Sequence, residues 1–201
     1  QGQAGHSILP RGFNQIKVKS FAPQILEKTR AFVREWSNFK AGHKVEGVNH
    51  WLTAMTADAV VACSMGLDMQ NVERMGAGRP VHPFIEHFRF GLGFVGRTIT
   101  AQTEFGAKRF LPGFNAQAKL QAKYENCKRE LHKLVDGMVE ATRAGELGGK
   151  DSIIRAMLED RAGSGKHVRY CAVYGHVINL MIAGHETTAA TLGFTLQLLA
   201  E

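Results

Sequence analysis

The sequence predicts a mainly helical, all-α fold. Apolar residues return every three or four positions in long segments without proline, which is the spacing of one face of an α-helix. Three segments show this most clearly, at residues 19–36, 116–144 and 173–199. Glycine and proline mark the breaks between the predicted elements. With 201 residues, of which 44% are hydrophobic, the chain is large enough to bury a sizeable core.

The N-terminal part is expected to contain two packed helices followed by a loop. Residues 19–36 carry apolar side chains on one side and Lys, Arg and Glu on the other, which is typical of an amphipathic packing helix. Residues 51–65 predict a more apolar helix that contains Asp58, and a carboxyl group on a mostly buried helix requires a polar partner. Residues 69–83 contain glycine, proline and arginine without a core pattern, so this segment is predicted to be a loop.

A phenylalanine-rich segment follows at residues 83–100. Its four phenylalanines form either an ordinary core cluster or the wall of an apolar pocket, and the sequence leaves both open. The same segment matches the dinucleotide-binding pattern G-x-G-x-x-G at residues 91–96. That site would also require a preceding strand, a following helix and an acid about 20 residues further on. Residues 84–90 are closer to a helical pattern than to a strand, so we reject this interpretation.

The C-terminal part predicts three further helices. A long amphipathic helix over residues 116–144 is broken by the glycines of residues 145–149. Asp151 or Ser152 can cap a short helix. After a polar loop, the last helix is expected to begin near Val168.

The middle of this last helix is where function is expected. It contains a glycine, an acid and two adjacent threonines, which helix propensity alone would not favour. A threonine within a helix can donate to the carbonyl one turn earlier, and Gly184 leaves that turn uncovered, so the helix can widen or bend there. Ala183, Thr187 and Thr191 lie one turn apart and share a stripe of one small and two hydroxyl-bearing side chains.

The pattern Ala183-Gly184-x-Glu186-Thr187-Thr188 resembles the oxygen-activation motif in the long central helix of the cytochrome P450 (haem-thiolate) monooxygenases. Patches in the same order along the chain extend the resemblance over nearly its whole length and favour the fatty-acid-hydroxylating branch, which is often fused to a reductase. These patches are His6–Leu9 with Phe13, Thr56–Asp58 with Cys63, His82–Ile85, and Asp151–Ile154 with Met157 and Leu158. The resemblance implies a single partial haem-monooxygenase domain over residues 1–201 that ends in the central helix.

The resemblance also implies a reaction. Haem, dioxygen and electrons from an NADPH reductase would hydroxylate an apolar substrate, in this branch a fatty acid. Thr187 would hydrogen-bond the oxygen species on the iron, and Glu186 would connect that hydroxyl to solvent. These two residues are the catalytic candidates. Gly184 would leave room for the cofactor, and Ala183 would face both the haem and the substrate.

Further site residues come from the same resemblance. His6 matches the second position of a Trp-x-x-x-His/Arg pair that binds a haem propionate, although Gly2 replaces the tryptophan. A surface histidine is the alternative for His6. Phe84 and Phe88 would contact the substrate, because helices at this point in the family line the substrate channel. His185 would point away from the cofactor or would only complete a polar face of the helix.

Two motifs of the resembling family do not occur in the sequence. Its haem iron is held by a cysteine thiolate in a glycine-rich loop that follows a Glu-x-x-Arg helix. Cys63, Cys127 and Cys171 instead lie in helical patterns. We therefore interpret the chain as an internal fragment that has no metal ligand, is inactive alone and binds haem only as part of the complete protein. FAD and FMN would be present if a reductase domain is fused, and a separate flavin reductase is otherwise the partner.

Two alternatives from other classes remain: a non-catalytic helical interaction domain and an inactive truncated gene product. The formal charge of +7 permits acidic partners, but Lys and Arg are scattered, so no nucleic acid is expected. Three cysteines without Cys-x-x-Cys spacing argue against a disulfide scaffold or a zinc site and favour a reducing, cytoplasmic location. Apolar stretches are interrupted before the about 18 residues of a membrane span, so no membrane anchor is expected.

Overall fold

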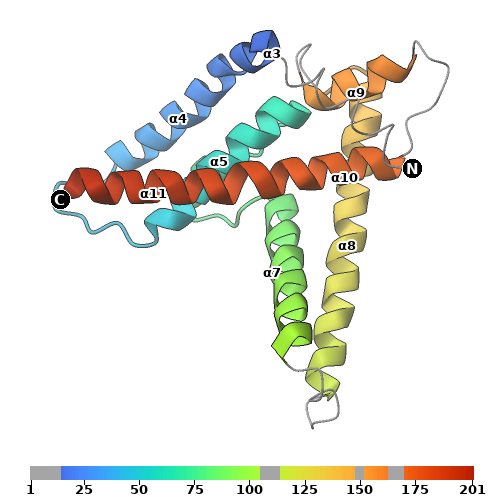
Figure 1. The fold of residues 1–201 in the computed structure, drawn as a ribbon. Helices are drawn as coiled ribbons and strands as arrows, with labels where there is room; N and C mark the ends of the chain where they lie inside the picture. The colour runs from blue at the N-terminus through green and yellow to red at the C-terminus, as the bar shows by residue number, and fades with distance from the viewer. Residues whose placement is uncertain (1–14, 105–113, 148–151, 163–169) are drawn as a thin grey trace. The chain divides into compact units, whose positions relative to one another are not determined.

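The computed structural model describes residues 15–104, 114–147, 152–162 and 170–201. All regular secondary structure in these ranges is helical, which confirms the predicted all-α class (Figure 1). The elements are α3 (Gln15–Ser20), α4 (Ala22–Ser37), α5 (Val48–Met65), α6 (Asn71–Gly76), α7 (Pro83–Glu104), α8 (Phe114–Arg143), α9 (Ile153–Ala162), α10 (Tyr170–Met181), the π-helical turn η2 (Ile182–Glu186) and α11 (Thr187–Ala200). They divide into two compact units, Gln1–Val81 with Met138–Glu201, and His82–Gly137.

Helix α5 is the centre of the first unit. Asp58 is the only Asp, Glu, Lys or Arg among its 18 residues, and a helix that is apolar on all sides becomes buried. It packs against α4, α6, α9, α10, η2 and α11. Gly47 and Gly66 flank it with positive φ angles of 65° and 68°, which glycine adopts without steric cost. The helix that carries the predicted functional motif is therefore supported by α5.

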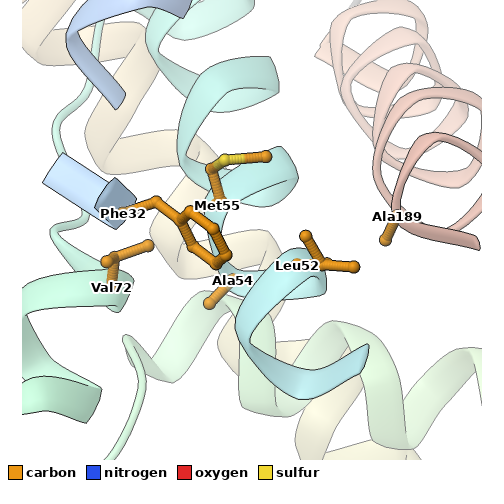
Figure 2. Close-up of a cluster of buried hydrophobic side chains, with 6 residues drawn as sticks. All are labelled: Phe32, Leu52, Ala54, Met55, Val72 and Ala189. Atoms are coloured by element: carbon orange, nitrogen blue, oxygen red, sulfur yellow. The ribbon is translucent and has the colours of Figure 1, made fainter. Parts of the chain in front are cut away.

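A cluster of buried apolar side chains joins four helices of this unit (Figure 2). It contains Phe32 of α4, Leu52, Ala54 and Met55 of α5, Val72 of α6 and Ala189 of α11. Trp36 and Trp51, the two tryptophans of the chain, pack against this cluster. Residues distant in sequence thus bury the inner side of α11.

The prediction of a loop over residues 69–83 is wrong in part, because α6 forms within it. The buried Asp58 carboxylate accepts hydrogen bonds from the Asn71 side-chain amide at 2.7 Å and from the Val72 backbone N–H at 3.1 Å. A carboxylate at this position satisfies a donor in the first turn of a helix and interacts favourably with its dipole. The same contacts confirm that Asp58 has the polar partner that its burial requires.

Some helix boundaries differ from the predictions by a few residues, because residues at the helix ends set where each helix begins. The expected helix over residues 19–36 is divided at Phe21, and Pro23 lies in the first turn of α4, where its missing N–H costs nothing. Ser152 precedes α9, and its hydroxyl oxygen accepts from the Arg155 N–H at 3.4 Å, as expected of a cap. Asp151, the other candidate cap, lies outside the described residues.

The second unit contains α7 and the greater part of α8. The three glycines of the G-x-G-x-x-G match lie inside α7 and not between a strand and a helix, which confirms the rejection of a dinucleotide site. The rings of Phe94 and Tyr124 stack with centroids 4.5 Å apart, and the Lys123 ammonium lies 4.4 Å from the centre of the Phe90 ring. Aromatic contacts therefore hold α7 against α8.

Candidate functional site

The predicted central helix is continuous from α10 through η2 to α11 (Figure 1). Its hydrogen-bond ladder widens at η2, which spans Ile182–Glu186 and contains the Ala-Gly-His-Glu part of the motif. Met181 and Thr187 on either side keep right-handed helical angles, so the helix is widened and not broken. This confirms the prediction that the helix widens or bends at the motif. Turns of this kind occur frequently at functional sites.

The stripe of small and hydroxyl-bearing side chains lies on the exposed side of this helix. Thr187 Oγ1 donates to the Ala183 carbonyl at 2.6 Å, as predicted, and Thr191 Oγ1 donates to the Thr187 carbonyl at 3.0 Å. Thr195 repeats the contact one turn later, at 2.8 Å to Thr191. A hydroxyl has a single hydrogen, so the Thr187 oxygen that faces solvent presents only its acceptor lone pairs.

The opposite side of the helix is buried. Its buried residues are Val173, Val177, Met181, His185 and Ala189. His185 is 0% exposed, and its Nδ1 lies 2.7 Å from the Met181 carbonyl. Because a carbonyl can only accept, Nδ1 carries the hydrogen of this contact. His185 thus lies away from the exposed stripe, and the alternative that it completes a polar surface face is wrong.

Gly184 allows a close approach between η2 and α5. A Cβ atom added to Gly184 would lie 2.7 Å from Cγ2 of Val60, which is closer than real side chains come. Val is branched at Cβ and rotates poorly away from such a contact. The structure therefore explains this glycine by helix packing, and its contact with a cofactor stays a prediction.

We expect Gly184→Ala to destabilise the fold by about 1–3 kcal/mol through overpacking, offset in part by the about 1 kcal/mol that alanine gains over glycine in a helix. Urea unfolding of single and double variants with Val60→Ala measures the coupling between the two positions. The matched control is Gly175→Ala in α10, where an added Cβ meets no atom within 4 Å. A Gly184→Ala variant as stable as the control, with no coupling to Val60, would show that the close approach is not real.

Glu186 is the acid of the motif. Its side chain is 52% exposed, and its Oε1 lies 4.0 Å from Nε2 of His185. A partly exposed carboxylate can exchange protons with water. The wide turn therefore places a solvent-accessible acid next in sequence to Thr187, whose hydroxyl lies on an open helix face.

The other predicted site residues belong to other segments of the chain. Phe84 and Phe88 of α7 are buried, with ring centroids 6.4 Å apart, which favours the core interpretation for this pair. Their contact with a substrate stays a prediction. His6 lies outside the described residues.

In the described part of the chain, no three His, Cys, Asp or Glu side chains lie close enough together to hold a metal ion. None of the described helices combines the length and the apolar character of a membrane span. Cys63 and Cys127 are free and buried. Burial raises the pKa of the Cys63 thiol to about 11, so it remains protonated near neutral pH. Since the thiolate is the form of cysteine that binds metals, Cys63 is unsuited to that role.

The sequence model of the family Cytochrome P450 matches residues 6–201. The chain belongs to the cytochrome P450 family. It is 21% identical to a self-sufficient cytochrome P450 monooxygenase from Phanerodontia chrysosporium, over 95% of this chain and 17% of that protein. It is 24% identical to a bifunctional cytochrome P450/NADPH–P450 reductase from Aspergillus oryzae, over 96% of this chain and 16% of that protein. The chain thus spans less than a fifth of the length of these curated relatives.

Solved structures show the same cytochrome P450 fold. The chain superimposes on the crystal structure of the cytochrome P450DA haem domain with a TM-score of 0.76 and 24% identity. The match covers 97% of this chain and 39% of that domain. Helices α10, η2 and α11 thus belong to a cytochrome P450 helical fold.

One contact at η2 was not predicted. The hydroxyl of Thr56, in α5, lies 2.8 Å from the carbonyl oxygen of His185. The available signal was the four-residue spacing of Leu52, Thr56 and Val60, which places a hydroxyl between two apolar side chains on one helix face. Nothing in the sequence alone indicates that this face meets the functional motif.

Proposed function

We propose that this chain is the oxygen-activating part of a haem-dependent cytochrome P450 monooxygenase that hydroxylates an apolar substrate, specifically a fatty acid. The observation that carries the proposal is the hydroxyl of Thr187 on an open helix face immediately after the wide turn. The fatty acid is suggested by the branch that the sequence resembles and by the phenylalanine-rich segment of α7.

The exposed face of the helix fits a flat, largely apolar cofactor. Ala183, Thr187 and Thr191 leave it covered by small side chains, while the bulkier Met181 and His185 point into the core. Haem, when bound, supplies the iron at which dioxygen is reduced and the substrate is oxidised. Ala183 and Thr187 would lie against it, and His6 would bind one of its propionates.

Thr187 and Glu186 would control the protons that this reaction consumes. The hydrogen of Thr187 Oγ1 is directed to the Ala183 carbonyl, so the outward lone pairs can accept a hydrogen bond and hold a proton donor, such as a water molecule, beside the reacting oxygen. Glu186 is exposed enough to take up a proton from solvent and return it toward this face. Ala183 would limit the space between these groups and the substrate.

The electrons would come from an NADPH reductase that carries FAD and FMN, either fused to this protein or separate. Support comes from the relative in Aspergillus oryzae, which is named a bifunctional cytochrome P450/NADPH–P450 reductase. The electron source is therefore part of the proposal for the whole protein.

The decisive experiment uses the full-length protein that contains this chain, loaded with haem, with NADPH and a flavin reductase under ¹⁸O₂. A saturated fatty acid is compared with an apolar substrate of another class, such as a steroid. We expect ¹⁸O in a hydroxylated fatty acid. Labelled steroid without labelled fatty acid would reject the substrate class, and a full-length protein that takes up no haem would reject the monooxygenase and favour an interaction domain.

A further inference from the structure

The contact between Thr56 and His185 joins the core helix to the wide turn. Thr56 Oγ1 has three carbonyl oxygens in reach, those of His185 at 2.8 Å, Leu52 at 3.0 Å and Thr53 at 3.2 Å. Hydroxyl donors are commonly found 2.7–2.8 Å from their acceptors. The His185 carbonyl, 129 residues away in the sequence, is therefore the best-placed acceptor for the single hydroxyl hydrogen.

This acceptor lies within the widened turn of the helix. Within η2 the regular i to i+4 hydrogen-bond ladder is replaced by the wider i to i+5 spacing of a π-helix. His185 is completely buried, so a hydrogen bond to its carbonyl is made away from water. Thr56 supplies a donor to this carbonyl from another helix, α5.

Leu52, Thr56 and Val60 lie one turn apart on α5 and face the helix formed by α10, η2 and α11, here called the motif helix. The chain directions of the two helices are opposite, so the first of the three residues meets the last part of the motif helix. A Cβ atom added to Gly193 would lie 3.7 Å from Cδ1 of Leu52, and Leu52 belongs to one buried cluster with Ala189. Thr56 reaches His185, and Val60 contacts Gly184. The small residues of the motif helix let α5 come close enough for the Thr56 hydroxyl to bond to its backbone.

We propose that Thr56 is a positioning residue, which holds the His185 carbonyl and thereby fixes the wide turn that presents Thr187 and Glu186 on the open face. The inference rests on the proposed function, because the turn matters only if those two residues deliver protons. Thr56 itself would touch neither substrate nor cofactor.

The test compares Thr56→Val with Thr53→Val in the full-length, haem-loaded protein. Both threonines are buried on α5, and valine keeps their shape, but the Thr53 hydroxyl donates within its own helix, to Asn49 at 2.7 Å. His185-Glu186 is the only His-Glu pair in the sequence. Labelling histidine carbonyls with ¹³C and glutamate nitrogens with ¹⁵N gives one NMR correlation for each His-Glu pair of the full-length protein. The correlation that disappears in Glu186→Asp reports the His185 carbonyl in the diamagnetic ferrous carbon monoxide form.

For Thr56→Val we expect the His185 carbonyl signal to move upfield, as it does when a hydrogen bond is lost. Product per NADPH should fall roughly fivefold with a matching rise in peroxide, which is the size of effect that one hydrogen bond can have. Thr53→Val should change neither quantity, and Thr56→Ser should restore both. Should Thr56→Val not fold, Thr56→Ala is judged by the same measurements.

Thr187→Ala, measured in parallel, tests the role of Thr56 separately from the proposed proton delivery by Thr187 and Glu186. An unmoved carbonyl signal, or unchanged product per NADPH in the Thr56 variants while Thr187→Ala is impaired, would overturn the role of Thr56 and leave the proposed function standing. Unchanged product per NADPH in Thr187→Ala would instead remove the proton-delivery mechanism itself.

Discussion

Replacing Thr187 by alanine is expected to lower product formation by about 10²-fold in the full-length enzyme, while NADPH is still consumed and peroxide is released. This is the lower end of what a positioned proton-transfer group contributes to a rate. The variant loses the acceptor oxygen on the open helix face, so a proton donor is no longer held beside the reacting oxygen. Measuring NADPH, product and peroxide in the same reaction tests the prediction.

Stability should change little in this variant. Thr187 is exposed, its hydrogen bond is made to its own helix, and alanine is the better helix former. Thr195→Ala is the matched control, because this threonine makes the same contact two turns later, to Thr191. Thr187→Ser should retain most of the activity. Equal product per NADPH in Thr187→Ala and Thr195→Ala would contradict the assignment of Thr187.

Replacing Asp58 by asparagine is expected to remove a pH dependence of folding stability worth about 3 kcal/mol. Burial raises the pKa of Asp58 from its ordinary value of 3.8 to about 6, although hydrogen bonds from Asn71 and Val72 act in the opposite direction. Between these two values the folded chain holds a proton that the unfolded chain has released. The free energy of unfolding therefore falls as the pH rises through this interval and levels off above it.

Asparagine does not ionise, so the free energy of unfolding of Asp58→Asn should lack this decrease. Between about pH 4 and about pH 7 the wild type should therefore lose about 3 kcal/mol of stability relative to the variant. Urea unfolding followed by tryptophan fluorescence measures it, because Trp36 and Trp51 both pack against the cluster in Figure 2. Asp136→Asn, which changes an exposed carboxyl group on α8, is the control. Parallel pH profiles for the wild type and Asp58→Asn would show that the buried carboxyl group does not titrate as expected.

Much of the fold could be predicted because its determinants are local. The three- and four-residue spacing of apolar side chains predicted the long helices, and the glycines at 145 and 66 follow helix ends where the backbone takes positive φ angles. The wide turn was also predictable, since a glycine and a threonine at Gly184 and Thr187 act within one turn of the same helix. The exposed stripe followed from the same short spacing.

The sequence by itself therefore determined the helical class, the place of the motif and the side chains on its open face. Only the tertiary structure decided that Asp58 starts α6, that His185 is buried, that Gly184 fits against Val60 and that Thr56 holds the His185 carbonyl. Each of these contacts joins different helices, in the case of Thr56 across 129 positions of the chain. A helical period shows which side of a helix is apolar, but the residue it meets there depends on how the helices pack.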